Sequence, residues 1–145
     1  LGAGGSLITR PEILARAKGL APQAHAPLHE NDRSATGFLP GPQFEAHADA
    51  FFANPEQSVG GWERAVDAQA RVLAALRHVV AHSPDEGDIA VIAHGGVGAL
   101  FRAHLMAATI DRSHDQPQGV GGGHLMAVAL PDWRLVRDWT AIETL

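Results

Sequence analysis

The sequence predicts an α/β protein with three layers, in which helices cover both faces of a sheet. Residues 89–93, "IAVIA", are apolar at every position, as a strand that is covered on both faces requires. Apolar residues also recur at helical spacing on either side of this run, at 62–82 and at about 97–107. Helices that alternate with buried strands are typical of an α/β/α sandwich.

The N-terminal part is predicted to hold short elements joined by loops. In chain order these are a helix over 12–18, a short strand over 24–28, a loop over 29–42, a helix over 43–53 and a loop over 54–61. The first helix follows Pro11 and stops at Gly19, in accord with proline at a helix start and glycine just past its end. Pro27 weakens the short strand because proline lacks a backbone N–H.

The C-terminal part carries the stronger patterns. It is predicted to hold a long helix over 62–82, a buried strand over 89–93, a helix over 97–107, a loop over 111–123, and two strands over 124–130 and 134–142. Trp62, Val66, Leu73, Leu76 and Val80 give the long helix its apolar stripe. A Pro-Asp-Trp turn joins the last two strands.

Composition limits the class of protein. The 145 residues are about one domain's length, so we expect a single domain over 1–145. No apolar tract is long enough to predict a membrane span. The net charge of -5, with both signs mixed, argues against a nucleic-acid partner. The chain has no cysteine, which excludes disulfides and thiolate metal sites and fits a cytoplasmic protein.

The junction of the predicted strand 89–93 with the following helix is a candidate anion site. His94 falls at the carboxyl end of that strand, where ligands bind in open α/β sheets. Gly95 and Gly96 have no side chains, so backbone N–H groups can approach a ligand at the positive end of the helix. The alternative is a strand–helix turn eased by glycine, with an incidental histidine.

Several motifs occur in one order over about residues 12–142. They are "LHE" at 28–30, "GWERAVDAQARV" with Glu63 and Arg71, "AHGGV" before a helix with Arg102, and "HLMAVAL" before a strand that closes on Trp139. Together they resemble the histidine phosphatase (phosphoglycerate-mutase-like) superfamily. The resemblance implies a phosphoglycerate-mutase-like three-layer sandwich and a phosphomonoester hydrolase acting through a phosphohistidine intermediate, with a mutase as the alternative.

The resemblance also assigns roles to residues. His94 matches the family's second, phosphate-binding histidine, and Glu30 matches the carboxylic acid that protonates the leaving group. From the residues alone, Glu30 is equally well a solvated loop carboxylate. The expected partner is a small phosphorylated substrate or inorganic phosphate, and the family needs neither a metal nor a cofactor. The sequence leaves the oligomeric state open.

One family motif is missing. The nucleophilic histidine of the family lies in an Arg-His-Gly triplet on the first, central strand, and this chain contains no such triplet. We expect that segment to precede Leu1, because "LGAGGSLITRPE" has neither an initiator methionine nor a signal-peptide pattern. Loss of a central strand should expose its neighbours' edges and much of the core. The alternative is a degenerate family member.

Four residues are further candidates for phosphate binding. They are Gly95, Arg10, Arg33 and His124. Arg10 shares only the Ser-to-Arg spacing of a family motif, and its alternative is a surface arginine at a helix start. Arg33 lies in the loop beside Glu30. His124 begins a strand at a place where the family often lines its pocket, and packing at the sheet edge explains it equally well.

Two other classes of function remain open. A non-catalytic anion-binding or interaction module would have kept the pocket and lost the nucleophile. A metal-dependent hydrolase is a more distant alternative, because His78 and His82 have the i,i+4 spacing of helical zinc ligands. No third ligand is evident near them in the sequence, so the prediction is no metal site.

Overall fold

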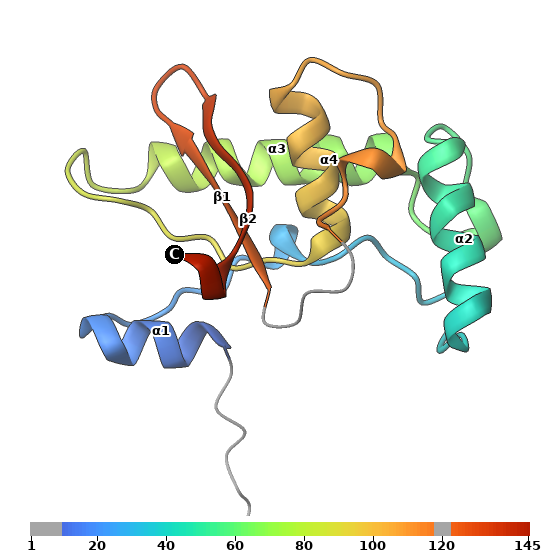
Figure 1. Cartoon of the computed structure of the whole chain (residues 1–145), viewed down its shortest axis with the longest axis horizontal. Helices are drawn as coiled ribbons and strands as arrows, with labels where there is room; N and C mark the ends of the chain where they lie inside the picture. Colours follow the sequence, from blue (N-terminus) through green and yellow to red (C-terminus); the bar gives the residue numbers. More distant parts are fainter. Residues whose placement is uncertain (1–9, 118–122) are drawn as a thin grey trace, which may run out of the picture.

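The structure, a computed structural model, describes residues 10–117 and 123–145. Its helices are α1 (Arg10–Lys18), α2 (Gly41–Ala53), α3 (Ala65–Ala81) and α4 (Gly95–Leu105), and its strands are β1 (His124–Ala129) and β2 (Arg134–Ala141). Short 3-10 turns cover Ala26–Leu28, Val59–Gly61, Arg112–His114 and Ile142–Thr144. Figure 1 shows α3 as the long central helix. Helix α4 crosses it, and α2 lies near the N-terminal end of α3.

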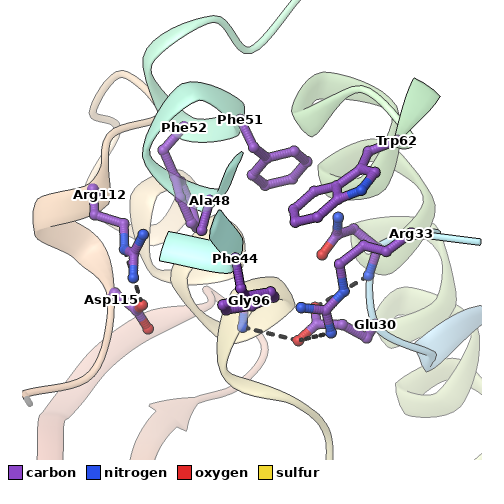
Figure 2. A pocket seen from close by; sticks show the side chains of 11 residues that line it. Glu30, Arg33, Phe44, Ala48, Phe51, Phe52, Trp62, Gly96, Arg112 and Asp115 are labelled. Atoms are coloured by element: carbon purple, nitrogen blue, oxygen red, sulfur yellow. Dashed lines mark hydrogen bonds and ion pairs between the residues drawn. The ribbon is translucent and has the colours of Figure 1, made fainter. Parts of the chain in front are cut away.

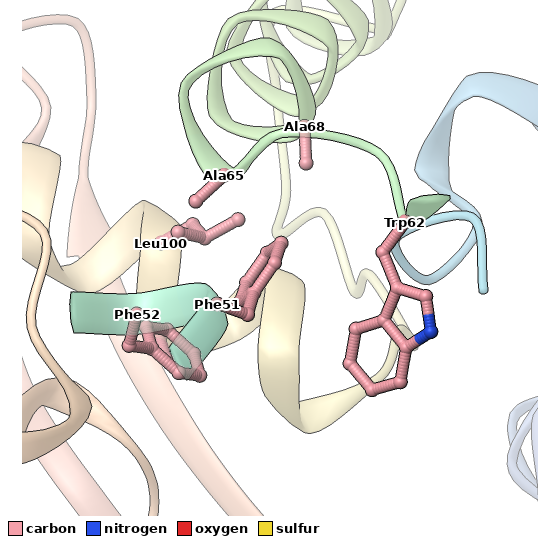
Figure 3. Close-up of a cluster of buried hydrophobic side chains, with 7 residues drawn as sticks. Phe51, Phe52, Trp62, Ala65, Ala68 and Leu100 are labelled. Atoms are coloured by element: carbon pink, nitrogen blue, oxygen red, sulfur yellow. The ribbon is translucent and has the colours of Figure 1, made fainter. Parts of the chain in front are cut away.

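The main core lies where α2, α3 and α4 meet. Ala65 and Ala68 of α3 and Ala99 of α4 are fully buried, and their small side chains let the two helices approach closely. Leu100 of α4 packs in the same cluster, and Figure 3 shows it beside Ala65. Phe51 joins α2 to this cluster. This packing fixes the start of α4 relative to α3 and α2.

A second cluster joins the hairpin to the helices. Val72 and Leu76 of α3 pack with Val97 of α4, and Trp133 of the hairpin turn covers them. Strands β1 and β2 are antiparallel, with His124 opposite Ala141 and Ala129 opposite Arg134. The contacts hold the hairpin against α4, as Figure 1 shows.

Most local predictions are confirmed. Helix α1 ends at Lys18, and Gly19 follows in the left-handed conformation (φ 66°) that glycine adopts readily. The helices predicted over 43–53, 62–82 and 97–107 are α2, α3 and α4, and the predicted C-terminal hairpin is present. Helix α3 begins at Ala65 rather than at Trp62, because the backbone is extended at Trp62 (ψ 157°) and at Arg64 (ψ 143°).

Two predicted strands are wrong. Residues 24–28 contain a 3-10 turn over Ala26–Leu28, since Pro27 restricts the backbone and cannot donate to a sheet. Residues 89–93 belong to no strand, and Ile89, Val91 and Ile92 are 37, 42 and 45% exposed. An apolar run needs a neighbouring strand to pair with, and the described residues place none beside it.

The described residues thus combine α-helices with a two-stranded sheet, which is compatible with the α/β class. None of the helices in the described ranges has both the length and the apolar character needed to cross a membrane.

Candidate functional site

The carboxylate of Glu30 lies at the start of α4. Its Oε2 accepts a hydrogen bond from the backbone N–H of Gly96 (3.3 Å), and its Oε1 accepts one from Val97 (3.1 Å) and one from Asn31 (3.1 Å). The first N–H groups of a helix have no partner within the helix and carry partial positive charge, so a carboxylate is stabilised there. Glu30 therefore occupies the helix start at which the sequence predicts an anion site.

Glycine is required at position 96 for this arrangement. A Cβ atom there would lie 2.8 Å from Oε1 of Glu30 and 3.2 Å from its carboxyl carbon. A Cβ on Gly95 would lie 2.9 Å from Nε2 of Gln116. The two glycines thus let loops from distant parts of the chain approach the first turn of α4.

His94 immediately precedes these glycines. It is the N-cap residue of α4, with extended backbone (φ -98°, ψ 161°), and its carbonyl accepts the N–H of Gly98 at 3.1 Å. Its side chain makes no capping hydrogen bond and is exposed. The imidazole is therefore available to a ligand at the helix start, although the strand predicted to carry it is absent.

An ion pair fixes the loop that carries Glu30. Arg71 of α3 donates from Nε and Nη2 to Glu63, at 2.9 and 2.7 Å. Its Nη1 also donates to the carbonyls of Pro27 (2.6 Å) and His29 (3.1 Å), directly before Glu30. Glu63 in turn accepts, at 3.1 Å, the N–H of Asp32, which lies two residues after Glu30. Both ends of the loop are thus tied to one pair of side chains.

The charge state of this pair agrees with its geometry. The hydrogen bond from Arg71 is the main cause that lowers the pKa of Glu63, and the backbone N–H of Asp32 adds to it against the opposing effect of burial. The resemblance drew attention to Glu63 and Arg71 without giving them contacts. In the structure they bond the loop backbone around Glu30 and act as positioning residues.

Arg33 lies beside Glu30, as its place in the loop predicted. Its Nη2 is 3.8 Å from Oε2 of Glu30, and its guanidinium lies over the rings of Phe44 (5.1 Å) and Trp62 (5.6 Å). The aromatic faces hold the cation through cation–π contact. No hydrogen bond from this guanidinium joins it to the rest of the described chain, so its N–H donors remain available.

A pocket of about 70 Å³ adjoins Glu30 and Arg33. Figure 2 shows these two residues and Gly96 along one side, Arg112 and Asp115 along another, and aromatic side chains between them. Arg112 is paired with Glu45, Asp49 and Asp115, at 2.8, 2.9 and 3.5 Å. Its charge is therefore largely neutralised, whereas Arg33 has one carboxylate beside it, that of Glu30 at 3.8 Å.

The sequence did not identify Asn31, which also lines this pocket. Asn31 is 6% exposed, and its Nδ2 has no hydrogen-bond partner among the described residues. Asparagine is common in turn-rich segments for conformational reasons, so nothing in the sequence distinguished this one from its neighbours. The sequence did not identify Arg112 either, because no local pattern links it to its acidic partners Glu45, Asp49 and Asp115.

Of the two other predicted phosphate ligands, Arg10 has a side chain that lies outside the described part, and no contact within the described residues joins His124 to Glu30. Arg10 begins α1, and neither its side chain nor residues 6–9 of the proposed motif belong to the described part. His124 begins β1, and its ring centroid is 6.4 Å from that of Trp139. Trp139 packs on Gly98 of α4, so the side chain of Trp139 lies between His124 and α4.

The two histidines with the spacing of zinc ligands, His78 and His82, contact each other and the helix backbone. The rings of His78 and His82 stack at 4.0 Å, and Nδ1 of His82 lies 2.8 Å from the carbonyl of His78. Within residues 10–117 and 123–145, no group of three His, Asp or Glu side chains is arranged to hold a metal ion.

The site thus combines a histidine at a helix start, a carboxyl group bonded to that helix, and an arginine beside the carboxyl group. Such a set can bind an anion and transfer a proton beside it. No curated protein matches the chain. A family model described as the histidine phosphatase superfamily (branch 1) matches residues 11–137. This match covers most of the 145 residues, and the chain belongs to the histidine phosphatase superfamily.

Proposed function

We propose that this chain supplies the phosphate-binding and proton-transfer groups of a phosphomonoester hydrolase that acts through a phosphohistidine intermediate. The observation that carries the proposal is the contact between Glu30 and the first turn of α4, directly after His94. Family membership supports a phosphatase or mutase type of activity on a small phosphorylated substrate.

His94 donates hydrogen bonds to the phosphoryl oxygens, where negative charge builds in the transition state. The N–H groups at the start of α4 and the guanidinium of Arg33 add further donors, and Gly95 lets the substrate approach. A phosphate that reaches this helix start competes with the carboxylate of Glu30 for the N–H groups of Gly96 and Val97.

When a phosphate displaces Glu30 from the N–H groups of α4, the carboxyl group of Glu30 becomes free to act as the proton donor. A general acid beside the phosphoryl group must carry the proton that it delivers. Once protonated, Glu30 donates its proton to the leaving oxygen as the phosphoryl group moves to the nucleophile. Arg71 and Glu63 keep the loop in place during this exchange, because they hold its backbone on both sides.

The reaction also needs a nucleophilic histidine. The 145 residues contain no Arg-His-Gly triplet, and we place that triplet in a segment before Leu1. A strand in that segment would pair with residues 89–93 and cover the exposed side chains of Ile89, Val91 and Ile92. The three-layer sandwich would then be complete, with the nucleophile beside His94.

The test uses the protein extended upstream of Leu1. We expect hydrolysis of para-nitrophenyl phosphate that persists in EDTA and falls about 10²- to 10³-fold in His94→Ala, as for loss of one transition-state donor. His104→Ala is the matched control, because His104 is an exposed histidine at the other end of the same helix. Equal rates for the two variants would refute the role of His94.

A non-catalytic anion-binding module is the second candidate, and the absence of the triplet from the sequence favours it. It predicts that the extended protein binds inorganic phosphate, that His94→Ala weakens this binding, and that no phosphoester is hydrolysed. Activity that EDTA abolishes would instead indicate the metal-dependent hydrolase.

A further inference from the structure

Gln116 brings a side-chain amide to the first turn of α4. A Cβ atom on Gly95, the residue directly after His94, would lie 2.9 Å from Nε2 of Gln116 and 3.5 Å from its amide carbon. The amide therefore packs against the first glycine of the helix. Glu30 approaches the second glycine, Gly96, in the same way. The start of α4 thus has a carboxyl group at one glycine and an amide at the other.

The protein itself makes no use of this amide. Gln116 is half-buried, and its backbone N–H donates to Oδ1 of Asp115 at 2.8 Å, but no described residue forms a hydrogen bond with its side chain. The amide of Gln69, which also reaches α4, instead donates to the carbonyl of Leu100 at 2.8 Å. An amide that is partly removed from water loses hydrogen bonds that only another partner restores. The unused amide at the start of α4 therefore points to a ligand there.

The loop before Gln116 is fixed by contacts with two other elements. Nε1 of Trp139 in β2 donates to the carbonyl of His114 at 2.9 Å. The guanidinium of Arg112 donates to two carboxylates of α2, at 2.8 and 2.9 Å. The amide of Gln116 is therefore held at the helix start by its neighbours rather than by bonds of its own. A group that the fold has already placed binds a ligand without the cost of being ordered at that moment.

Arg33 and Gln116 approach the start of α4 from opposite sides. Figure 2 shows Arg33 on one side of this helix start and Asp115 on the other, and Asp115 lies against Gly95 together with Gln116. Arg33 supplies positive charge on its side, with one carboxylate, that of Glu30, 3.8 Å away. On the other side the carboxylate of Asp115 is engaged, because Oδ1 accepts the N–H of Gln116 and Oδ2 lies 3.5 Å from the guanidinium that bonds α2. Gln116 therefore supplies the free donor on that side.

We propose that Gln116 is a phosphate-binding residue whose amide N–H donates to a phosphoryl oxygen at the start of α4. This inference rests on the proposed function, because the phosphate concerned is the one that His94 and Arg33 bind there. A phosphoryl group offers several acceptor oxygens, and donors on different sides of it hold it in one orientation. Gln116 thus orients the phosphoryl group, while Arg33 supplies the positive charge.

The test measures the binding of inorganic phosphate to the protein extended upstream of Leu1, by isothermal titration at constant ionic strength. We expect Gln116→Ala to weaken this binding about tenfold, as loss of one hydrogen bond to a charged group would. Gln116→Glu should weaken it at least as much, since a carboxylate of nearly the same shape accepts instead of donating and repels the anion. Gln116→Ala should keep the thermal midpoint of the wild type, because the amide has no partner among the described residues.

Gln57→Ala and Gln57→Glu are the matched controls. Gln57 is an exposed glutamine in the loop after α2, so the same substitutions change size and charge equally and should leave phosphate binding unchanged. A measurement on the wild-type protein removes any dependence on the fold of a variant. The side-chain amide resonances of Gln116 should shift as phosphate is added, whereas those of Gln69, which is bonded to Leu100, should stay in place.

The outcomes separate this inference from the proposed function. If phosphate binds and the Gln116 variants bind it as tightly as the Gln57 controls, the role of Gln116 is overturned and the proposed function stands. Unmoved amide resonances of Gln116 in a protein that binds phosphate overturn it in the same way. If the wild-type protein binds no phosphate, the proposed phosphate site fails and the role of Gln116 fails with it.

Discussion

At the scale of single residues, the site depends on how closely Glu30 approaches the backbone of α4. The carboxylate bonds two N–H groups of the first turn, and Gly96 has no side chain that would obstruct it. The sequence identified both residues separately, one from its Leu-x-Glu context and one from the glycine pair. Their contact joins positions 66 residues apart, which no local pattern contains.

Gly96→Ala tests that contact. The added Cβ would lie 2.8 Å from Oε1, so Glu30 must move away and the helix start loses its capping carboxylate. We expect a loss of about 0.5–2 kcal/mol in the free energy of unfolding, the usual range for a lost helix cap. Gly41→Ala is the control, since nothing lies within 4 Å of its Cβ position and alanine favours a helix. Equal stability of the two variants in urea denaturation would contradict the contact.

At the scale of elements, local signals predicted helices well and strands unevenly. Helix α3 and the hairpin carry their own periodicity and turn residues, and both form. The run "IAVIA" has the composition of a buried strand but needs a partner from elsewhere in the chain, which the described residues do not supply. The loop that holds Glu30 depends on Arg71, 41 residues away, so sequence pattern could not assign its shape.

The bond between Arg71 and Glu63 makes that loop sensitive to acid. The pKa of Glu63 is lowered in the folded protein, chiefly by Arg71, so the unfolded state binds a proton more readily. The stabilisation is therefore present above the unfolded value near 4.5 and is lost as the pH falls through the lower folded value. Stability measured in urea between pH 7 and pH 3 should show this loss.

Glu63→Gln should flatten that part of the profile and cost about 1.5–3 kcal/mol at pH 7, the usual range for a hydrogen bond to a charged group. Asp67→Asn is the control, because its pair with Arg64 is about half exposed and should contribute much less. An unchanged pH profile in Glu63→Gln would show that the pair does not hold the loop.

At the scale of the whole molecule, stability is concentrated where α2, α3 and α4 meet, and the segment 89–93 lies outside that core. Leu100 is fully buried in this cluster, whereas Ile92 is 45% exposed. The apolar residues of 89–93 are therefore not explained by packing in the described residues. Under the proposed function, a strand from a segment before Leu1 would cover them.

Truncation of Leu100 and of Ile92 tests whether a further strand covers residues 89–93. In the 145-residue chain, Leu100→Ala should cost about 2–5 kcal/mol of unfolding free energy, as for a buried leucine. Ile92→Ala should cost about 1 kcal/mol, since 45% of its area remains in water. In the protein extended upstream of Leu1, the cost of Ile92→Ala should rise into the same 2–5 kcal/mol range, because both faces of its strand would then be covered. A cost that stays low in the longer protein would mean that no strand pairs with 89–93, and the nucleophile would have to reach His94 by another route.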